Sequence, residues 1–247
     1  MKKIVYIFLF TLFACNSEDG NDCFQTTGTI VQEEILVSNF ERILVNRNIE
    51  LVITEASEYK VIIETGENLL NDINVEVIAN QLVLSDNNSC NFVREYGITK
   101  IYVDAPNLNE IRTSSQYEIS SNGVLNYSTL SLFSEDFNEG SEFTVGDFRL
   151  NVNSNSLNIV SNNISFFYLE GAVQNLSVGF YSGVGRVEGE NLIAENVSVY
   201  HRGSNDMVVN PQQSLSGQLL GTGDLISVNQ PPNIDVEQIY TGELIFN

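Results

Sequence analysis

Few residues in this chain have the side chains that enzymes use for catalysis. His201 is the only histidine, there are three cysteines, and tryptophan is absent. The glycines from Gly183 to Gly189 lack the lysine of a phosphate-binding loop, and no Gly-x-Ser-x-Gly motif is present. His201 has no nearby sequence partner that would make it a general base, so we expect an exposed histidine at a corner of the fold. The sequence therefore predicts no catalytic residue.

Acidic residues recur in the second half of the chain and are the candidates for metal binding. Asp206, Asp224 and Glu243 each follow a Gly- or Ser-rich turn, at spacings near 20 residues. If these turns stack, the carboxylates lie about 5 Å apart, where like charges raise each other's pKa or recruit a calcium ion. Paired carboxylates can also cleave glycosides. Solubilising acids on a solvent face explain the same residues, so we predict no metal and no cofactor, and keep calcium as the weaker alternative.

Aromatic residues in the middle of the second half could stack on sugar rings. If they lie in strands, about half should point inward to the core and half outward. The absence of tryptophan weakens a sugar platform, so core packing is the favoured interpretation. The six residues are Phe166, Phe167, Tyr168, Phe180, Tyr181 and Tyr200.

The composition excludes nucleic acid as a partner. The chain has 247 residues, of which 43% are hydrophobic and 17% charged, so it can bury a core as one or two domains. Acidic residues outnumber basic ones 32 to 11, which gives a formal net charge of -21. Phosphate contacts need clustered lysine and arginine, and the sequence has no such cluster.

The first residues are typical of an exported lipoprotein. Lys2 and Lys3 precede an apolar run over residues 4–13 that is too short to span a bilayer and fits a signal peptide. Leu12-Phe13-Ala14-Cys15 resembles the lipobox of bacterial lipoproteins, in which the cysteine receives the lipid. We therefore predict a signal peptide at residues 1–14 and lipid attachment at Cys15; an ordinary secretory signal is the alternative.

A polar acidic stretch follows the predicted lipid site and should act as a tether. We expect residues 15–29 to form this lipidated, flexible segment. Residues 16–22 also resemble the export signal that carries Bacteroidota lipoproteins to the outer face of the outer membrane, although a solvated spacer explains them equally well. The predicted location is the outer membrane, on the cell surface or on the periplasmic face, with the lipid as the membrane anchor.

Two cysteines remain for a disulfide if Cys15 carries lipid. Cys23 and Cys90 would lie in an oxidising compartment, where a bond between them is the simple expectation. Such a bond would attach the tether to the folded body. Free thiols are the alternative, because the sequence contains no information on their distance.

Strand patterns dominate the body of the chain and predict an all-β fold. β-branched residues alternate with polar ones in several short runs, and no stretch has convincing helical periodicity. The clearest runs are residues 40–45, 49–53, 59–63, 75–78 and 81–84.

A turn motif repeats in the second half and predicts a coiled architecture. Gly- or Ser-rich turns precede Arg186-Val187, Asp206-Met207, Asp224-Leu225 and Glu243-Leu244, at spacings of 20, 18 and 19 residues. This pattern favours a right-handed parallel β-helix, or β-solenoid, over residues 30–247, with N-terminal coils at 30–105 and the repeat region at 106–247. A β-sandwich is the second choice. We expect glycine at the corners because these positions need positive φ; the corner residues are Gly183, Gly185, Gly203, Gly221, Gly223 and Gly242.

An ordered series of motifs gives a family resemblance. Phe40-Glu41-Arg42-Ile43, Glu67-Asn68-Leu69-Leu70 and Asp104-Ala105-Pro106-Asn107-Leu108 precede the repeated turns, among which Leu220-Gly221-Thr222-Gly223-Asp224 is close to a Ser-Gly-Ala-Gly-Asp corner. From about residue 30 to 246 the chain resembles the head GIN domain family of putative auto-transporter adhesins, a domain of unknown function common in Bacteroidota lipoproteins. The resemblance implies a right-handed parallel β-helix and no established activity.

These observations predict a non-enzymatic module of the cell envelope. We expect an adhesin-like or scaffold role in which one solenoid face binds glycan or an envelope protein. A polysaccharide lyase or hydrolase is the first alternative, although the basic residues that a lyase needs beside acidic sugars are scattered along the sequence. A structural component of an envelope assembly is the second, because a terminal coil exposes a strand edge. The sequence does not predict the oligomeric state.

Overall fold

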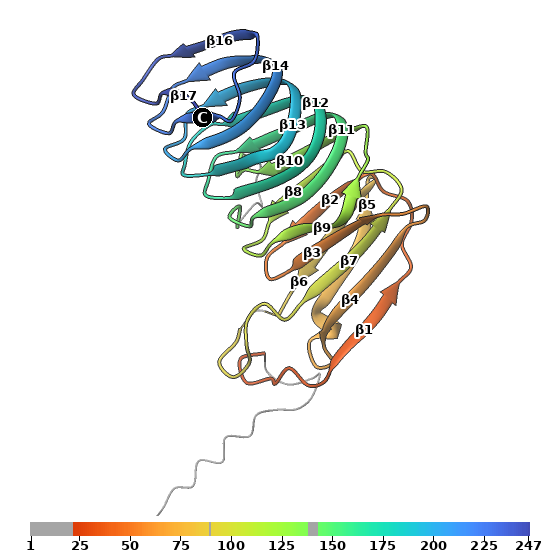
Figure 1. Ribbon diagram of the computed structural model, residues 1–247. Coiled ribbons are helices and arrows are strands. Elements are labelled where there is room, and N and C mark those ends of the chain that lie inside the picture. The colour runs from red at the N-terminus through yellow and green to blue at the C-terminus, as the bar shows by residue number, and fades with distance from the viewer. Residues whose placement is uncertain (1–21, 89, 138–142) are drawn as a thin grey trace, which may run out of the picture.

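The computed structural model describes residues 22–88, 90–137 and 143–247 (Figure 1). The predicted signal peptide and the predicted lipid site, Cys15, lie outside the described residues. The described chain is almost entirely β-structure, with seventeen strands and one short 3₁₀ helix, η1. None of its helices has the length and apolar character needed to cross a membrane.

The elements follow one another along the chain with short connections. They are β1 (Ile30–Ile35), β2 (Arg42–Asn46), β3 (Glu50–Glu55), β4 (Lys60–Gly66), η1 (Leu70–Asp72), β5 (Ile73–Ile78), β6 (Gln81–Asp86), β7 (Lys100–Ala105), β8 (Glu110–Ser114), β9 (Ile119–Leu125), β10 (Thr129–Ser134), β11 (Phe148–Ser161), β12 (Phe166–Phe180), β13 (Arg186–His201), β14 (Met207–Leu219), β15 (Leu225–Ser227), β16 (Asn233–Gln238) and β17 (Leu244–Phe246).

The strands form two layers that meet in the long strand β11. One layer runs β1-β4-β7-β3-β9 and continues into the first half of β11. The other runs β5-β6-β2-β8-β10 and continues into the second half of β11. Beyond β11, the long strands β12, β13 and β14 each contribute to both layers, as their stacked ribbons show in Figure 1.

The predicted right-handed parallel β-helix over residues 30–247 is wrong, because the strands form a mixed, nearly closed sheet. β1 pairs antiparallel with β4, β4 with β7, and β5 with β6. Ala79 and Asn80 both have positive φ and form the two-residue turn that joins β5 to β6, a geometry typical of an antiparallel hairpin. The sequence could not reveal this difference, because apolar residues alternate with polar ones in both kinds of sheet.

The strands from β11 onward pair in parallel and in register with the repeated turns. Phe166 lies opposite Arg186, and Val187 lies opposite Met207. Leu225, which follows the next turn, lies opposite Leu244. Equivalent positions of successive turns therefore form columns across the sheet, with neighbouring strands about 4.8 Å apart.

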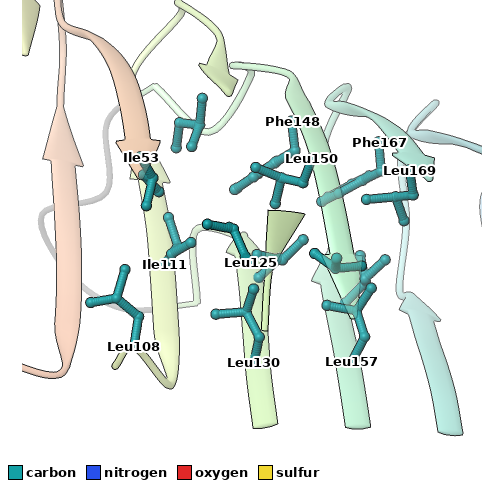
Figure 2. Close-up of a cluster of buried hydrophobic side chains, with 14 of the residues drawn as sticks. Ile53, Leu108, Ile111, Leu125, Leu130, Phe148, Leu150, Leu157, Phe167 and Leu169 are labelled. Atoms are coloured by element: carbon teal, nitrogen blue, oxygen red, sulfur yellow. The ribbon is translucent and has the colours of Figure 1, made fainter. Parts of the chain in front are cut away.

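One hydrophobic core, with buried members from Phe40 to Leu225, fills the space between the two layers. Its members come from nearly every strand between β2 and β15. Figure 2 shows Leu130 and Leu157 from neighbouring strands, and also Phe148 beside Phe167. The rings of Phe148 and Phe167 stack with centroids 5.0 Å apart and an interplanar angle of 6°. Each fully buried side chain of this size contributes about 1.5–3 kcal/mol of hydrophobic stabilisation.

The corner glycines are required by close approach more than by backbone conformation. Gly183 has a φ of +84°, but the other five predicted corner glycines do not have positive φ. At Gly221, a Cβ atom would lie only 2.1 Å from the carbonyl oxygen of Gly203 in the preceding corner. The expected explanation by positive φ is thus correct for Gly183 alone. At Gly221, Gly223 and Gly242 a side chain is excluded by a backbone oxygen of a stacked corner, whereas at Gly185 and Gly203 the nearest atom would lie 3.2 Å away.

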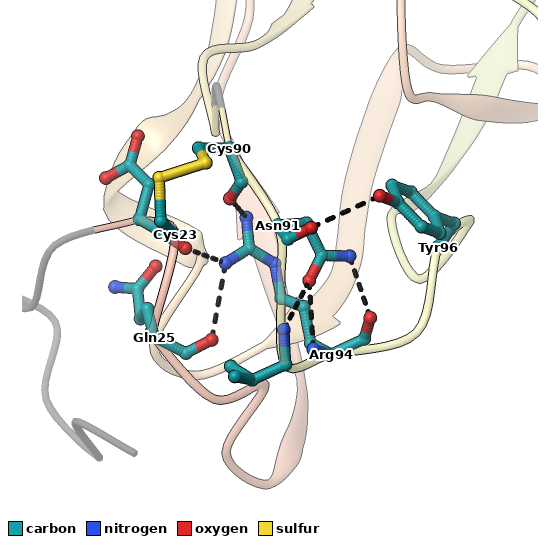
Figure 3. The surroundings of a disulfide bond; sticks show 8 residues. Cys23, Gln25, Cys90, Asn91, Arg94 and Tyr96 are labelled. Atoms are coloured by element: carbon teal, nitrogen blue, oxygen red, sulfur yellow. Dashed lines mark hydrogen bonds between the residues drawn. A yellow bond between two sulfur atoms is a disulfide. The ribbon is translucent and has the colours of Figure 1, made fainter. Parts of the chain in front are cut away.

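A disulfide attaches the start of the described chain to the body. Cys23 and Cys90 are bonded, and the guanidinium of Arg94 lies beside them (Figure 3). Arg94 donates hydrogen bonds to the carbonyl oxygens of Asp22, Gln25 and Cys90. The described end of the predicted tether is therefore held against the loop that follows β6.

The acidic residues predicted at the corners form a hydrogen-bonded column. Asp206 Oδ1 accepts the backbone N–H of Asp224 at 3.2 Å, and Asp224 Oδ1 accepts that of Glu243 at 2.8 Å. In an earlier turn, Asp147 Oδ1 accepts the N–H of Phe166 at 2.9 Å. Asp206 also pairs with Arg186 at 3.2 Å. These carboxylates join one turn to the next, which explains why an acid recurs before the apolar residue.

His201 is buried, contrary to the expectation of an exposed corner histidine. Its ring packs edge-on against Phe180, and within the described chain neither nitrogen has a hydrogen bond of normal geometry. A Cβ atom at Gly223 would lie 2.7 Å from His201 Nε2, so this corner glycine makes room for the ring. Burial lowers the pKa of His201; the backbone of Asn205 and the carboxylates of Asp206 and Asp224 oppose this effect.

Substitution of Asp224 tests the acidic column. Asp224→Ala should lower the free energy of unfolding by about 1 kcal/mol, because the N–H of Glu243 loses its acceptor. Asp224→Asn should keep most of the stability, since the amide oxygen can accept the same bond. Urea unfolding measures both, with Asp235→Ala on exposed β16 as a control that should change stability by less than about 0.5 kcal/mol. Equal stabilities of the Asp224→Ala variant and the wild type would contradict the role of the column.

The buried histidine predicts a loss of stability in mild acid. Because the pKa of His201 in the folded protein is below 6.5, the unfolded chain takes up the proton first. The contribution of His201 is therefore complete above pH 6.5 and declines as the pH falls. Between pH 7.5 and 5.5, protonation of His201 in the unfolded chain should lower the free energy of unfolding by at most about 1.4 kcal/mol.

Urea unfolding at the two pH values checks this prediction. In the sheet, His201 lies between Phe180 and Leu219, so leucine can take its place. The His201→Leu variant should therefore lose less stability between the two pH values than the wild type. Identical declines in both proteins would mean that other groups cause the pH dependence.

Candidate functional site

The outer surface of the second layer carries an ordered array of small polar side chains. Along β10 and the second halves of β11–β14, alternate residues face outward, and parallel pairing aligns these residues in three columns; Gly179 is the one outward position that is buried. We call this surface the Ser/Asn face. Its columns are Thr129, Ser156, Asn175, Asn196 and Ser214; Ser131, Asn158, Ser177, Ser198 and Ser216; and Phe133, Val160, Gly179, Tyr200 and Gln218.

No position of the Ser/Asn face carries a charge. This is unusual for a chain with a formal net charge of -21. Charged residues appear in these columns only on the neighbouring strands, with Glu110 and Arg112 on β8 and with Asp235 and Glu237 on β16. The buried residues between the columns, such as Leu176 and its register partners, belong to the core and fix the outward direction of the polar ones.

Side-chain hydrogen bonds order the first column. Asn196 Nδ2 donates to Asn175 Oδ1 at 3.2 Å, and Ser214 Oγ donates to Asn196 Oδ1 at 2.8 Å. In the second column, the hydroxyls of Ser177 and Ser198 are exposed and make no hydrogen bond within the described residues. The face therefore combines a fixed row of amides with hydroxyl groups that can both donate and accept.

An open hollow of about 740 Å³ borders the Ser/Asn face where the long strands bend. Asn175 and Asn196 belong to both the hollow and the face. Most of the other lining residues are uncharged, including Asn153, Asn155 and Gln174; Glu195 is the acidic exception. The uncharged surface thus continues from the flat face into a concave region.

The six aromatic residues predicted as core or sugar platform divide between the core and the surface. Phe167 and Phe180 are fully buried in the core. Phe166, Tyr168 and Tyr200 are half-buried, and Tyr181 is 42% exposed. Core packing is therefore right for two of the six. Strand alternation directs Phe166, Tyr168 and Tyr200 outward, and Tyr181 follows the end of β12.

A second hollow, of about 390 Å³, lies over the first halves of the long strands and is charged. Glu170, Glu188 and Glu190 line it together with Arg149, which is paired with Glu118 at 3.1 Å. The Arg149 guanidinium also lies 4.2 Å from the centre of the Tyr168 ring, so it covers this ring. The basic group of this hollow, Arg149, is thus already engaged with Glu118 and Tyr168.

The predicted site residues belong to the frame around these surfaces. Asp206, Asp224 and Glu243 join successive corners, the six glycines allow the corners to stack, and Cys23 and Cys90 lie at the other end of the described chain. Over residues 22–88, 90–137 and 143–247, no cluster of three or more His, Cys, Asp or Glu side chains could hold a metal ion.

Sequence reasoning missed the Ser/Asn face. A signal was present, because Asn175 and Ser177, Asn196 and Ser198, and Ser214 and Ser216 repeat the same alternation at the period of the turns. These residues carry no distinctive chemistry one by one. Only their alignment in the sheet makes them a continuous surface.

Comparisons with known proteins identify the family. A family model described as "Putative auto-transporter adhesin, head GIN domain" matches residues 39–231. No curated protein shows significant similarity to the chain.

Solved structures share the fold. A putative adhesin from Bacteroides fragilis NCTC 9343 has a TM-score of 0.79 and 21% identity, over 90% of this chain and 99% of that one. A putative adhesin from Parabacteroides merdae ATCC 43184 has a TM-score of 0.66 and 14% identity, with coverages of 90% and 98%. A putative lipid binding protein from Parabacteroides distasonis ATCC 8503 has a TM-score of 0.63 and 13% identity, with the same coverages. At these identities the likeness concerns the fold alone.

The family match confirms the resemblance found in the sequence. The family description suggests a non-enzymatic, adhesin-like role and a location at the cell surface or in the envelope. The chain belongs to the head GIN domain family of putative auto-transporter adhesins.

Proposed function

We propose that this chain is a non-enzymatic, adhesin-like lipoprotein that binds uncharged glycan through the Ser/Asn face. The observation that carries the proposal is the absence of charge from fifteen aligned outward positions in a chain with a net charge of -21. A surface that only had to remain soluble would be expected to carry part of this charge. Twelve of the fifteen residues are Ser, Thr, Asn, Gln or Tyr, whose side chains exchange hydrogen bonds with hydroxyl groups.

Neutral glycans match this surface chemically. Their hydroxyl groups donate and accept hydrogen bonds, as the Asn amides and Ser hydroxyls of the face do. Binding would remove no fixed charge of the face from water, so the desolvation cost stays low. Acidic glycans would instead be repelled by the overall negative charge of the protein.

The proposed anchor lies at the N-terminal end of the chain. Lipid on Cys15 would hold the protein at the outer membrane, and residues 15–29 would connect it to the domain. The disulfide between Cys23 and Cys90 and the contacts of Arg94 support a firm attachment on the domain side. The Ser/Asn face lies on β10–β14, away from this end of the molecule (Figure 1), so an anchored domain would leave it open to a ligand.

A carbohydrate-active enzyme is the competing function, because the charged hollow contains Glu170, Glu188 and Glu190. An enzyme would release shortened oligosaccharides, whereas the proposed module would bind its ligand unchanged. Product analysis after incubation separates the two functions.

A charge placed on the face tests the proposal. Ser198→Glu should weaken the binding of neutral oligosaccharides at least about tenfold, because the new carboxylate must be desolvated beside the ligand. The measurement is calorimetric titration of the full chain in lipid nanodiscs with linear neutral hexasaccharides.

Ser38→Glu is the matched control, since Ser38 is exposed in the loop before β2. It should bind like the wild type. Failure of the wild type to bind any neutral glycan, or equal binding by the Ser198→Glu variant, would contradict the proposal.

A further inference from the structure

Three aromatic rings form a cluster at the border of the Ser/Asn face. The centroids of the Tyr181 and Tyr200 rings are 5.1 Å apart, with an interplanar angle of 31°. Phe137 meets Tyr181 edge-on, with centroids 5.9 Å apart. Phe137 is 63% exposed and Tyr181 is 42% exposed. We call these three residues the aromatic cluster.

The Tyr181 ring occupies a place in the face that a side chain at Gly179 would otherwise fill. Gly179 is an outward position of the third column and lies opposite Tyr200. A Cβ atom at Gly179 would lie 2.9 Å from Cε2 of Tyr181. Gly179 thus lets Tyr181 fold back over the strand, so two tyrosine rings stand side by side in one column.

The exposed rings of the aromatic cluster do not contribute to the packing of the core. Phe180 and its neighbours already fill the interior beneath. The hydroxyls of Tyr181 and Tyr200 make no hydrogen bond within the described part of the chain. Exposed rings with unengaged hydroxyls offer a surface that is apolar over the ring and polar at its edge.

Beside the cluster lie the hydroxyl groups of the second column. Ser177 and Ser198 are two residues before Gly179 and Tyr200 on the same strands and point to the same side. Asp136, the acid adjacent to Phe137, is hydrogen-bonded to Asn162. An apolar patch and an uncharged hydrogen-bonding surface therefore adjoin each other.

We infer that Tyr181 and Tyr200, with Phe137 at their edge, are the stacking subsite for a pyranose ring of the bound neutral glycan. A pyranose has the same two-sided character, since its C–H groups form an apolar face and its hydroxyls project from the rim. The C–H face would pack against the tyrosine rings while the rim hydroxyls bond to Ser177 and Ser198. This inference rests on the proposed function and assigns part of the affinity for neutral glycan to these three residues.

Four substitutions test the subsite in the full chain in lipid nanodiscs, with linear neutral hexasaccharides as probes. Tyr181→Ala and Tyr200→Ala should each weaken binding about tenfold, and Tyr181→Phe should bind within about threefold of the wild type, because it keeps the ring. Gly179→Ala should weaken binding by displacing the Tyr181 ring without removing it. Tyr96→Ala, at an exposed tyrosine in the loop between β6 and β7 near the disulfide, is the matched control and should bind like the wild type.

The readouts are calorimetric affinity and tyrosine fluorescence, which is informative because the chain lacks tryptophan. Circular dichroism checks that each variant is folded. If both alanine variants at 181 and 200 bind like the wild type while Ser198→Glu does not bind, the stacking subsite is refuted and the glycan-binding face stands. If the wild type binds no neutral hexasaccharide, the proposed function fails and the subsite fails with it.

Discussion

The in-register stacking of parallel strands is the constraint on which the rest of this structure depends. Once each turn lies directly over the last, every position acquires the same environment as its equivalents about 4.8 Å away. An inward position is therefore apolar in most turns: Phe148, Phe167, Val187 and Met207 form one such column, and the column of Phe180 and Leu219 also takes the buried Ser161 and His201. A corner position must leave room for the preceding corner, which is why Gly221 faces the carbonyl of Gly203.

The same constraint turns scattered polar residues into a surface. Ser and Asn are ordinary outward residues in a single strand, but in stacked strands they become columns. The hydrogen bonds from Ser214 to Asn196 and from Asn196 to Asn175 show that neighbouring members of a column interact. Charged groups repeated in such columns would repel one another. At the corners, the carboxylates of Asp206 and Asp224 accept backbone hydrogen bonds, and Asp206 also pairs with Arg186.

The N-terminal half forms the end of the stack of strands, and its strand pairing differs from that of the second half. Strands β1, β4 and β5 pair antiparallel at this end, where β1 and β5 are the edge strands of the two layers. The disulfide and Arg94 hold the preceding segment beside the loop after β6. The disulfide-bonded start of the described chain and the proposed ligand surface on β10–β14 therefore lie at opposite ends of the described structure (Figure 1).

Local patterns in the sequence were sufficient for the strand class, the family and the period of the corners, because alternation and turn glycines are properties of short segments. They could not distinguish parallel from antiparallel pairing in residues 30–105, since both use the same alternation. Nor could they place His201, whose burial depends on the glycine corners of other turns, or reveal the Ser/Asn face and the contact of Tyr181 with Tyr200. These features join residues that are about twenty positions apart in the chain, and only the register of the folded sheet brings them together.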